Sequence, residues 1–286
     1  MRVGIFIVGA PKSATTSLHN YLNQHPEILM SSLKEPDFFS FQEISEQALY
    51  YGKSKINNIS QYHNLFNGKK GAKIFGESSV SYLFYPEVSK RIKEYNSQAK
   101  IIVMLRNPSD RAFSHYLMDL RLGLVSSRFE DIFYDKEGLH FQQYFLLGNY
   151  YSQVKRYVDE FKKDNVHIIW YSDFKKDAAK EIKKVFKFVD VDSDYKVNVN
   201  AMYNKSFIPR NNIIKIIYSL VFFRKLMLFF LSPRIVRFIK SILFIKQNKP
   251  SITRETREVL TEYYQDDIAN LEKLLSINLS QWKKLD

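Results

Sequence analysis

The stretch that decides the fold runs Ile5-Phe6-Ile7-Val8-Gly9-Ala10-Pro11-Lys12-Ser13-Ala14-Thr15-Thr16-Ser17-Leu18. An apolar run ends at Gly9, and a turn of small residues follows it. Leu18, Tyr21 and Leu22 then repeat at helical spacing. A strand, a turn and a helix in this order present the free N–H groups and the positive dipole end of the helix, and both favour a bound anion. The stretch therefore predicts a phosphate-type anion site inside an α/β fold.

The turn itself carries one lysine and several hydroxyl groups. Lys12 adds a positive charge, and the hydroxyl donors are Ser13, Thr15, Thr16 and Ser17. The spacing is not the Walker A pattern G-x-x-x-x-G-K-S/T, because Lys12 follows Gly9 by three residues and no second glycine precedes it. No acidic strand end that would help to hold Mg²⁺ is evident either. We expect an anion site without a metal, and the alternative is an ordinary turn before a helix with a Ser or Thr cap.

Composition narrows the class of protein. The chain has 286 residues, of which 45% are hydrophobic, enough for one large α/β domain or two small ones. It has no cysteine, which excludes disulfides and thiolate metal sites, and its six histidines show no H-x-x-x-H or H-E-x-x-H spacing. The apolar start is too short for a signal peptide, so we interpret it as a buried strand of a cytoplasmic protein.

Alternating patterns along the chain predict a three-layer, P-loop-like α/β fold with a central, mostly parallel sheet flanked by helices. Further strands are expected at residues 28–30, 72–79, 100–105 and 166–171. Helices are expected at residues 82–95, 111–122, 151–162, 178–189, 213–245 and 253–275. Active sites in such sheets lie at the carboxyl ends of the strands, so Lys12, Glu77 and Arg106 should converge there.

A second anion site is predicted after the strand at 100–105. Arg106 follows this strand directly, Asn107-Pro108 begins a helix, and Ser114 falls about two turns into that helix. A planar guanidinium and a hydroxyl suit a phosphate group. Two separated anion sites fit a ligand that carries two phosphate groups on one small scaffold.

Both motifs resemble those of the sulfotransferases that use 3′-phosphoadenosine 5′-phosphosulfate (PAPS), in particular the bacterial branch related to heparan sulfate N- and 3-O-sulfotransferases. The 5′-phosphosulfate loop of this family is similar to residues 9–18, and its 3′-phosphate element is similar to residues 102–116. Lys34-Glu35-Pro36-Asp37-Phe38-Phe39 resembles the segment that supplies the base in heparan-type members. Weaker matches extend the resemblance over nearly the whole chain, which we expect to form one domain over residues 1–286.

The resemblance implies a site with residues in defined roles. Lys12, Ser13, Ala14, Thr15, Thr16 and Ser17 would bind the 5′-phosphosulfate, and Arg106 and Ser114 the 3′-phosphate. Asn204, Ser206 and Arg210 would close over the nucleotide, although an ordinary loop is an equal alternative.

The same resemblance implies the chemistry. Lys12 would stabilise charge on the bridging oxygen, and Glu35 would take the proton of the acceptor. Glu77 or His115 could serve as the base instead, unless Glu77 pairs with Arg106 or Lys12 and His115 is simply packed. Tyr150 would line the acceptor cleft or belong to the core. One departure is Ser78, which stands where heparan-type members often have a lysine.

A basic, apolar segment spans residues 210–247. Nine Lys and Arg and no acidic residue lie between Phe207 and Lys249, out of a formal net charge of +13. Central charges make a membrane span costly, so residues 213–245 are expected either to bind an anionic membrane surface as amphipathic helix or to cover the core as a lid. Nucleic-acid binding is not expected, because the charges are surrounded by aliphatic side chains.

The sequence therefore predicts a PAPS-dependent sulfotransferase, cytoplasmic or peripheral on the inner membrane face, with a carbohydrate or glycolipid acceptor and no metal. The main alternative is a non-catalytic nucleotide-binding, membrane-associated scaffold. A P-loop kinase is a second alternative, which the missing Walker spacing disfavours.

Overall fold

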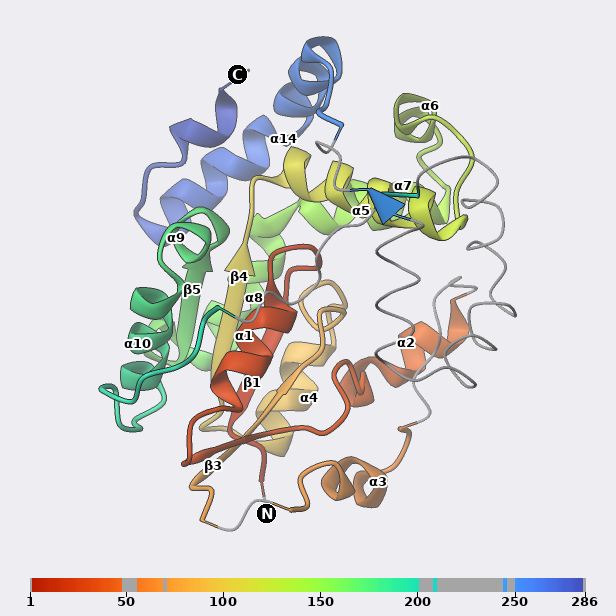
Figure 1. Cartoon of the computed structure of the whole chain (residues 1–286). Helices are drawn as coiled ribbons and strands as arrows, with labels where there is room; N and C mark the ends of the chain where they lie inside the picture. The colour runs from red at the N-terminus through yellow and green to blue at the C-terminus, as the bar shows by residue number, and fades with distance from the viewer. Residues whose placement is uncertain are drawn as a thin grey trace.

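The computed structural model describes residues 2–47, 56–68, 71–200, 208–209, 244–245 and 250–284. Its centre is a sheet of five strands in the order β2-β3-β1-β4-β5, in which every pairing is parallel. The strands are β1 (Ile5–Gly9), β2 (Ile28–Met30), β3 (Ile74–Ser78), β4 (Lys100–Leu105) and β5 (Val166–Trp170). The α/β fold with a parallel sheet between helices, expected from the sequence, is confirmed (Figure 1).

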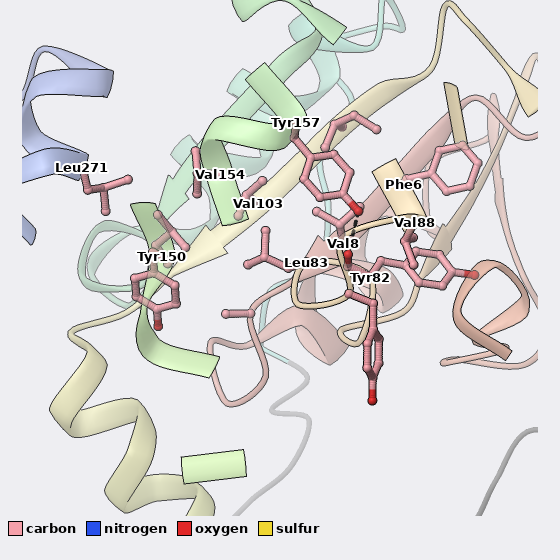
Figure 2. Close-up of a cluster of buried hydrophobic side chains, with 14 of the residues drawn as sticks. Phe6, Val8, Tyr82, Leu83, Val88, Val103, Tyr150, Val154, Tyr157 and Leu271 are labelled. Carbon is pink, nitrogen blue, oxygen red and sulfur yellow. Dashed lines mark hydrogen bonds between the residues drawn. The ribbon is translucent and has the colours of Figure 1, made fainter. Parts of the chain in front are cut away.

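Both faces of the sheet are buried, as the continuous apolar runs of its central strands require. Along β1, Phe6 and Val8 belong to one apolar cluster, whereas Ile5 and Ile7 belong to another on the opposite face. Figure 2 shows the first cluster, in which the Tyr157 hydroxyl donates to the Tyr82 carbonyl. The period of two therefore divides one strand between two cores.

Four helices cover these two faces (Figure 1). Leu18 and Ile182 contribute to the cluster around Ile5, which places α1 (Thr15–Leu22) and α10 (Ala178–Phe188) on that face. The other face carries α4 (Val88–Tyr95) and α8 (Tyr150–Phe161), and α14 (Arg254–Leu275) packs against α8.

The remaining elements complete the described chain. The α-helices are α2 (Phe41–Glu46), α3 (Ile59–Asn64), α5 (Pro108–Leu122), α6 (Phe129–Tyr134), α7 (Leu139–Tyr144) and α9 (Tyr171–Lys176). The 3₁₀ turns are η1 (Phe38–Ser40), η2 (Leu146–Gly148), η3 (Lys163–Asn165) and η4 (Ser280–Lys283). β6 (Ile208–Pro209) and β7 (Phe244–Ile245) form a separate antiparallel pair.

Two helix predictions need correction. The helix expected at residues 82–95 begins only at Val88, because tertiary partners take the carbonyls before it: Arg156 donates to Leu83 and Phe84 at 3.0 and 2.8 Å, and Tyr157 donates to Tyr82 at 2.8 Å. The helix expected at residues 213–245 is wrong at its end, where residues 244–245 pair as β7. Residues 213–243 lie outside the described residues.

The order of the strands creates a reversal between β1 and β4. The chain leaves β1 toward β2 on one side of the sheet and leaves β4 toward β5 on the other. Ligands in open α/β sheets bind at such a switch point, outside the carboxyl ends of the strands. The Lys12 turn follows β1 and Arg106 follows β4, so both predicted anion sites stand at this position.

Candidate active site

The turn after β1 has a backbone suited to close contact with an anion. Gly9 cannot carry a side chain here, because a Cβ would stand 2.7 Å from Cβ of Leu83. Lys12 and Ala14 both have left-handed backbones, with φ of 67° and 71°, a strained state typical of functional loops. Helix α1 starts directly after Ala14 without a side-chain cap, so its first N–H groups face outward from the helix end.

Ser13 adds a second observation that points to a ligand. Its side chain is fully buried, and its Oγ has no hydrogen-bond partner among the described residues. Buried hydroxyls in native proteins are nearly always satisfied. An anion in the turn would supply the missing acceptor.

Arg106 converges with the Lys12 turn, as the strand-end argument predicts. Its Nη1 donates to the Lys12 carbonyl at 3.2 Å, and its guanidinium lies over the Tyr171 ring, 4.7 Å from the centroid. Its own carbonyl accepts the Tyr150 hydroxyl at 3.0 Å. The buried Nε of Arg106 has no partner in the described part of the chain, so the guanidinium keeps a donor for an anion.

Helix α5 borders the same space. Lys12 Nζ lies 3.2 Å from Met118 Sδ on this helix. Ser114 precedes Met118 by four residues and therefore shares its helix face. Asn107 holds the start of α5, accepting from the Ser109 amide at 3.0 Å and donating to the Trp282 carbonyl at 3.0 Å. Lys12 therefore contacts both Arg106 and α5, and Ser114 lies on the face of α5 that Lys12 contacts.

Glu35 lies at the neighbouring strand end. Its amide donates to the Ser78 carbonyl at 2.9 Å, which ties the loop to the end of β3, and β3 pairs directly with β1. Its carboxylate forms an ion pair with Lys34, and 43% of its side chain is exposed. A half-exposed carboxylate at this strand end can receive a proton from an incoming acceptor.

Glu77 does not join Lys12 and Arg106, so that part of the expected convergence is wrong. In register it pairs with Phe6, and its fully buried carboxylate accepts hydrogen bonds from Tyr62, Tyr82 and Ser79 at 2.8, 2.9 and 2.8 Å. The expected ion pair with Arg106 or Lys12 is wrong for the same reason. Burial raises the pKa of Glu77 to about 7, although the hydroxyl donors oppose the rise.

Two other candidates are packed inside the protein. His115 is buried, and its Nδ1 lies 3.1 Å from the Gln143 carbonyl. Burial and the neighbouring Arg111 lower the pKa of His115 well below its usual range. Tyr150 is fully buried in the core, the second of the two predicted environments, and its hydroxyl donates to the Arg106 carbonyl.

Some expected residues cannot be placed, and others were not expected. Asn204, Ser206 and Arg210 lie outside the described residues. Sequence reasoning missed Tyr171 as the ring under Arg106, although Tyr171 follows β5 directly and the strand-end rule could have found it. It also missed Met118, which no local signal marks as a neighbour of Lys12.

The described residues also bear on metal binding and on membrane-spanning helices. They contain no group of three or more His, Asp or Glu placed to hold a metal ion. None of the helices in the described ranges is long and apolar enough to cross a membrane.

Fold and site together define a P-loop-like α/β protein in which the Lys12 turn and Arg106 meet at the switch point. A sequence model of the sulfotransferase domain matches residues 3–222. The chain belongs to this sulfotransferase domain family.

A solved structure extends the match. The crystal structure of a sulfotransferase from Alicyclobacillus acidocaldarius is 28% identical and covers 99% of this chain and 100% of its own, with a TM-score of 0.73. The described architecture is therefore that of a known bacterial sulfotransferase.

Curated relatives match over shorter lengths. Membrane-associated sulfotransferase kil1 of Dictyostelium discoideum is 28% identical over 157 residues, 55% of this chain and 31% of that protein. Heparan sulfate glucosamine 3-O-sulfotransferase 5 of Homo sapiens is 26% identical over 205 residues, 68% of this chain and 56% of that protein. The chain thus spans less than two thirds of either relative.

Proposed function

We propose that this chain transfers a sulfuryl group from PAPS to a hydroxyl or amine of a carbohydrate. The observation that carries the proposal is the convergence of the Lys12 turn with Arg106. Each has a buried donor without a partner among the described residues, Ser13 Oγ and Arg106 Nε. These two positions suit a nucleotide with phosphate groups at both its 5′ and 3′ ends. Family membership supplies sulfuryl transfer as the reaction.

In the proposed division of roles, the turn residues Ser13, Ala14, Thr15, Thr16 and Ser17 bind the 5′-phosphosulfate through their amides and hydroxyls. Arg106 and Ser114 bind the 3′-phosphate, the first as a planar fork and the second as a hydroxyl on the adjoining helix. Asn204, Ser206 and Arg210 stay predicted contacts of the same nucleotide.

The transfer step follows from the charges at the site. The acceptor O–H or N–H gives its proton to the Glu35 carboxylate, its oxygen or nitrogen bonds to sulfur, and the bond from sulfur to the bridging phosphate oxygen breaks. Negative charge grows on that bridging oxygen, where the Lys12 ammonium stabilises it. The product nucleotide is 3′-phosphoadenosine 5′-phosphate (PAP). We expect the step to need no metal ion, since Lys12 and Arg106 supply the positive charge.

The acceptor class rests on the relatives. The human relative is named for heparan sulfate glucosamine, and a carbohydrate acceptor for this chain is proposed from that likeness. A glycolipid is the finer alternative. We also propose that residues 1–286 act as one sulfotransferase domain.

Membrane contact is a separate prediction. Residues 213–245 lie almost wholly outside the described residues. The nine Lys and Arg between Phe207 and Lys249 are the reason to expect binding to an anionic leaflet. Deletion of 213–245 should release the protein from phosphatidylserine vesicles but not change its behaviour with phosphatidylcholine vesicles. Equal partitioning of both proteins would favour the lid.

Transfer of radiolabelled sulfate from PAPS to an unsulfated heparosan oligosaccharide tests the activity. Lys12→Ala should lower transfer by about 10²–10³, the usual loss when one transition-state donor is removed. Lys90→Ala is the matched control, because Lys90 is exposed on α4 and pairs only with Glu87 at 3.4 Å. Full activity of Lys12→Ala would refute the assignment. A protein that binds PAP but transfers sulfate to no carbohydrate, glycolipid or other acceptor tried would favour the scaffold.

A further inference from the structure

The loop that carries Glu35 has a backbone that needs outside support. Glu35 and Asp37, on either side of Pro36, have left-handed φ angles of 61° and 51°. Residues with side chains seldom adopt this conformation, because Cβ crowds the following carbonyl oxygen. Two such residues in three positions persist only where the surrounding structure holds them.

Three backbone amides of the loop donate hydrogen bonds to the end of β3 and the segment that follows it. The Glu35 amide donates to the Ser78 carbonyl at 2.9 Å, and the Asp37 amide donates to Ser79 Oγ at 3.1 Å. The Phe39 amide donates to the Tyr82 hydroxyl at 3.2 Å. Two of the three acceptors are therefore side-chain hydroxyls, whose direction depends on where their own hydrogens point.

Glu77 sets that direction. The hydroxyls of Ser79 and Tyr82 donate to its two carboxylate oxygens at 2.8 and 2.9 Å. Above its raised pKa of about 7 the Glu77 carboxyl is ionised and only accepts, so both hydroxyls donate to it and keep oxygen lone pairs for the loop amides. The Glu77 side chain is fully buried, and no water competes for these bonds.

We propose that Glu77 is a positioning residue for Glu35, acting through the hydroxyls of Ser79 and Tyr82 on the backbone of the loop between them. This inference rests on the proposed function, in which Glu35 takes the proton of the acceptor. The inference gives the buried Glu77 carboxylate, which lies outside the predicted anion site, a part in the same reaction.

The structure offers a matched pair of variants. Tyr62 and Tyr82 are both fully buried and both donate to Oε1 of Glu77, at 2.8 and 2.9 Å. Only Tyr82 also accepts from a loop amide. The Tyr62 ring stacks on Phe38 at 4.7 Å, a contact that phenylalanine preserves. Tyr82→Phe and Tyr62→Phe thus remove the same bond to Glu77, and only the first disconnects the loop.

Amide hydrogen exchange of the peptide that covers residues 34–41 tests the contact without any substrate. Tyr82→Phe should exchange about fivefold faster at Phe39, the effect of losing one hydrogen bond. Tyr62→Phe should stay within about twofold of the wild type. Equal exchange in both variants would overturn the inference, whether or not the protein is a sulfotransferase.

Transfer from PAPS to the heparosan oligosaccharide tests the consequence for catalysis. Tyr82→Phe should lower kcat about tenfold and leave the KM for PAPS and the affinity for PAP unchanged, whereas Tyr62→Phe should keep kcat within about twofold. An equal loss in both variants would indicate a structural role alone and overturn the inference. A wild type that neither binds PAP nor transfers sulfate would instead refute the proposed function, and the exchange result would still judge the contact.

Discussion

Replacing Glu77 by glutamine removes an ionisable group from the centre of the protein with almost no change in shape. The wild-type carboxyl is fully buried, and burial raises its pKa from 4.5 to about 7. The folded protein therefore holds this proton over a pH range in which the unfolded chain has already lost it. Glutamine cannot titrate, so the variant lacks this dependence.

The magnitude follows from the difference between the two pKa values. Each pH unit between them corresponds to about 1.4 kcal/mol, which gives about 3 kcal/mol for Glu77. Because the pKa of Glu77 is higher in the folded protein than in the unfolded chain, its contribution to the free energy of unfolding is fully present below pH 4.5. This contribution is lost as the pH rises through about 7. Relative to the wild type, Glu77→Gln should therefore gain about 3 kcal/mol in its free energy of unfolding between pH 4.5 and pH 8.

Urea unfolding followed by intrinsic fluorescence at several pH values measures this difference. Burial also raises the pKa of Asp37 to about 7, but Asp37 is present in both proteins and its contribution largely cancels. Glu262→Gln, at an exposed position of α14, is the control for the loss of a surface carboxyl. A stability difference for Glu77→Gln that does not change with pH would refute the account of Glu77 as a buried, desolvated carboxyl.

Three further changes test the site and its support. Arg106→Ala should weaken PAP binding about 10–100-fold in calorimetry and leave AMP binding nearly unchanged, because the lost charge-assisted bonds go to the 3′-phosphate; equal losses for both nucleotides would contradict that role. Glu35→Gln should preserve PAP affinity and lower sulfate transfer about 10²–10⁴-fold, the usual contribution of a general base, and unaltered turnover would exclude Glu35 as the base. Asp267 accepts hydrogen bonds from the amides of Tyr150 and Tyr151, the first two residues of α8, at 2.7 and 3.1 Å. Asp267→Ala should therefore lower the free energy of unfolding by about 1–2 kcal/mol in thermal unfolding at pH 5, and an unchanged Tm would show that this helix cap is dispensable.

Strand ends made the main part of the site predictable from sequence. Lys12 and Arg106 each follow a continuous apolar run, and parallel strands bring their carboxyl ends to one edge. Glu77 was misplaced because it is the fourth residue of β3 and lies inside the strand. Its register partner Phe6 shows that it faces a helix-covered side of the sheet and not the edge.

Contacts between distant segments explain the remaining differences. Pro86 is a local signal against a helix before Val88, because proline has no backbone N–H and disfavours helical geometry in the residue before it. No local pattern shows that Arg156, more than 70 residues away, takes the carbonyls of Leu83 and Phe84. The left-handed backbone of Glu35 likewise has no sequence signal, since glycine, asparagine or aspartate usually marks such positions. These features depend on tertiary hydrogen bonds and become visible only in the folded chain.

The most direct test of the central claim is calorimetric titration of the protein with PAP in the absence of Mg²⁺, with AMP and ATP as comparisons. The convergence of the Lys12 turn with Arg106 predicts tight binding of PAP, weaker binding of AMP, which lacks the 3′-phosphate, and no gain when Mg²⁺ is added. A preference for ATP with Mg²⁺, or no binding of PAP, would contradict the two-phosphate site and the proposed sulfotransferase activity.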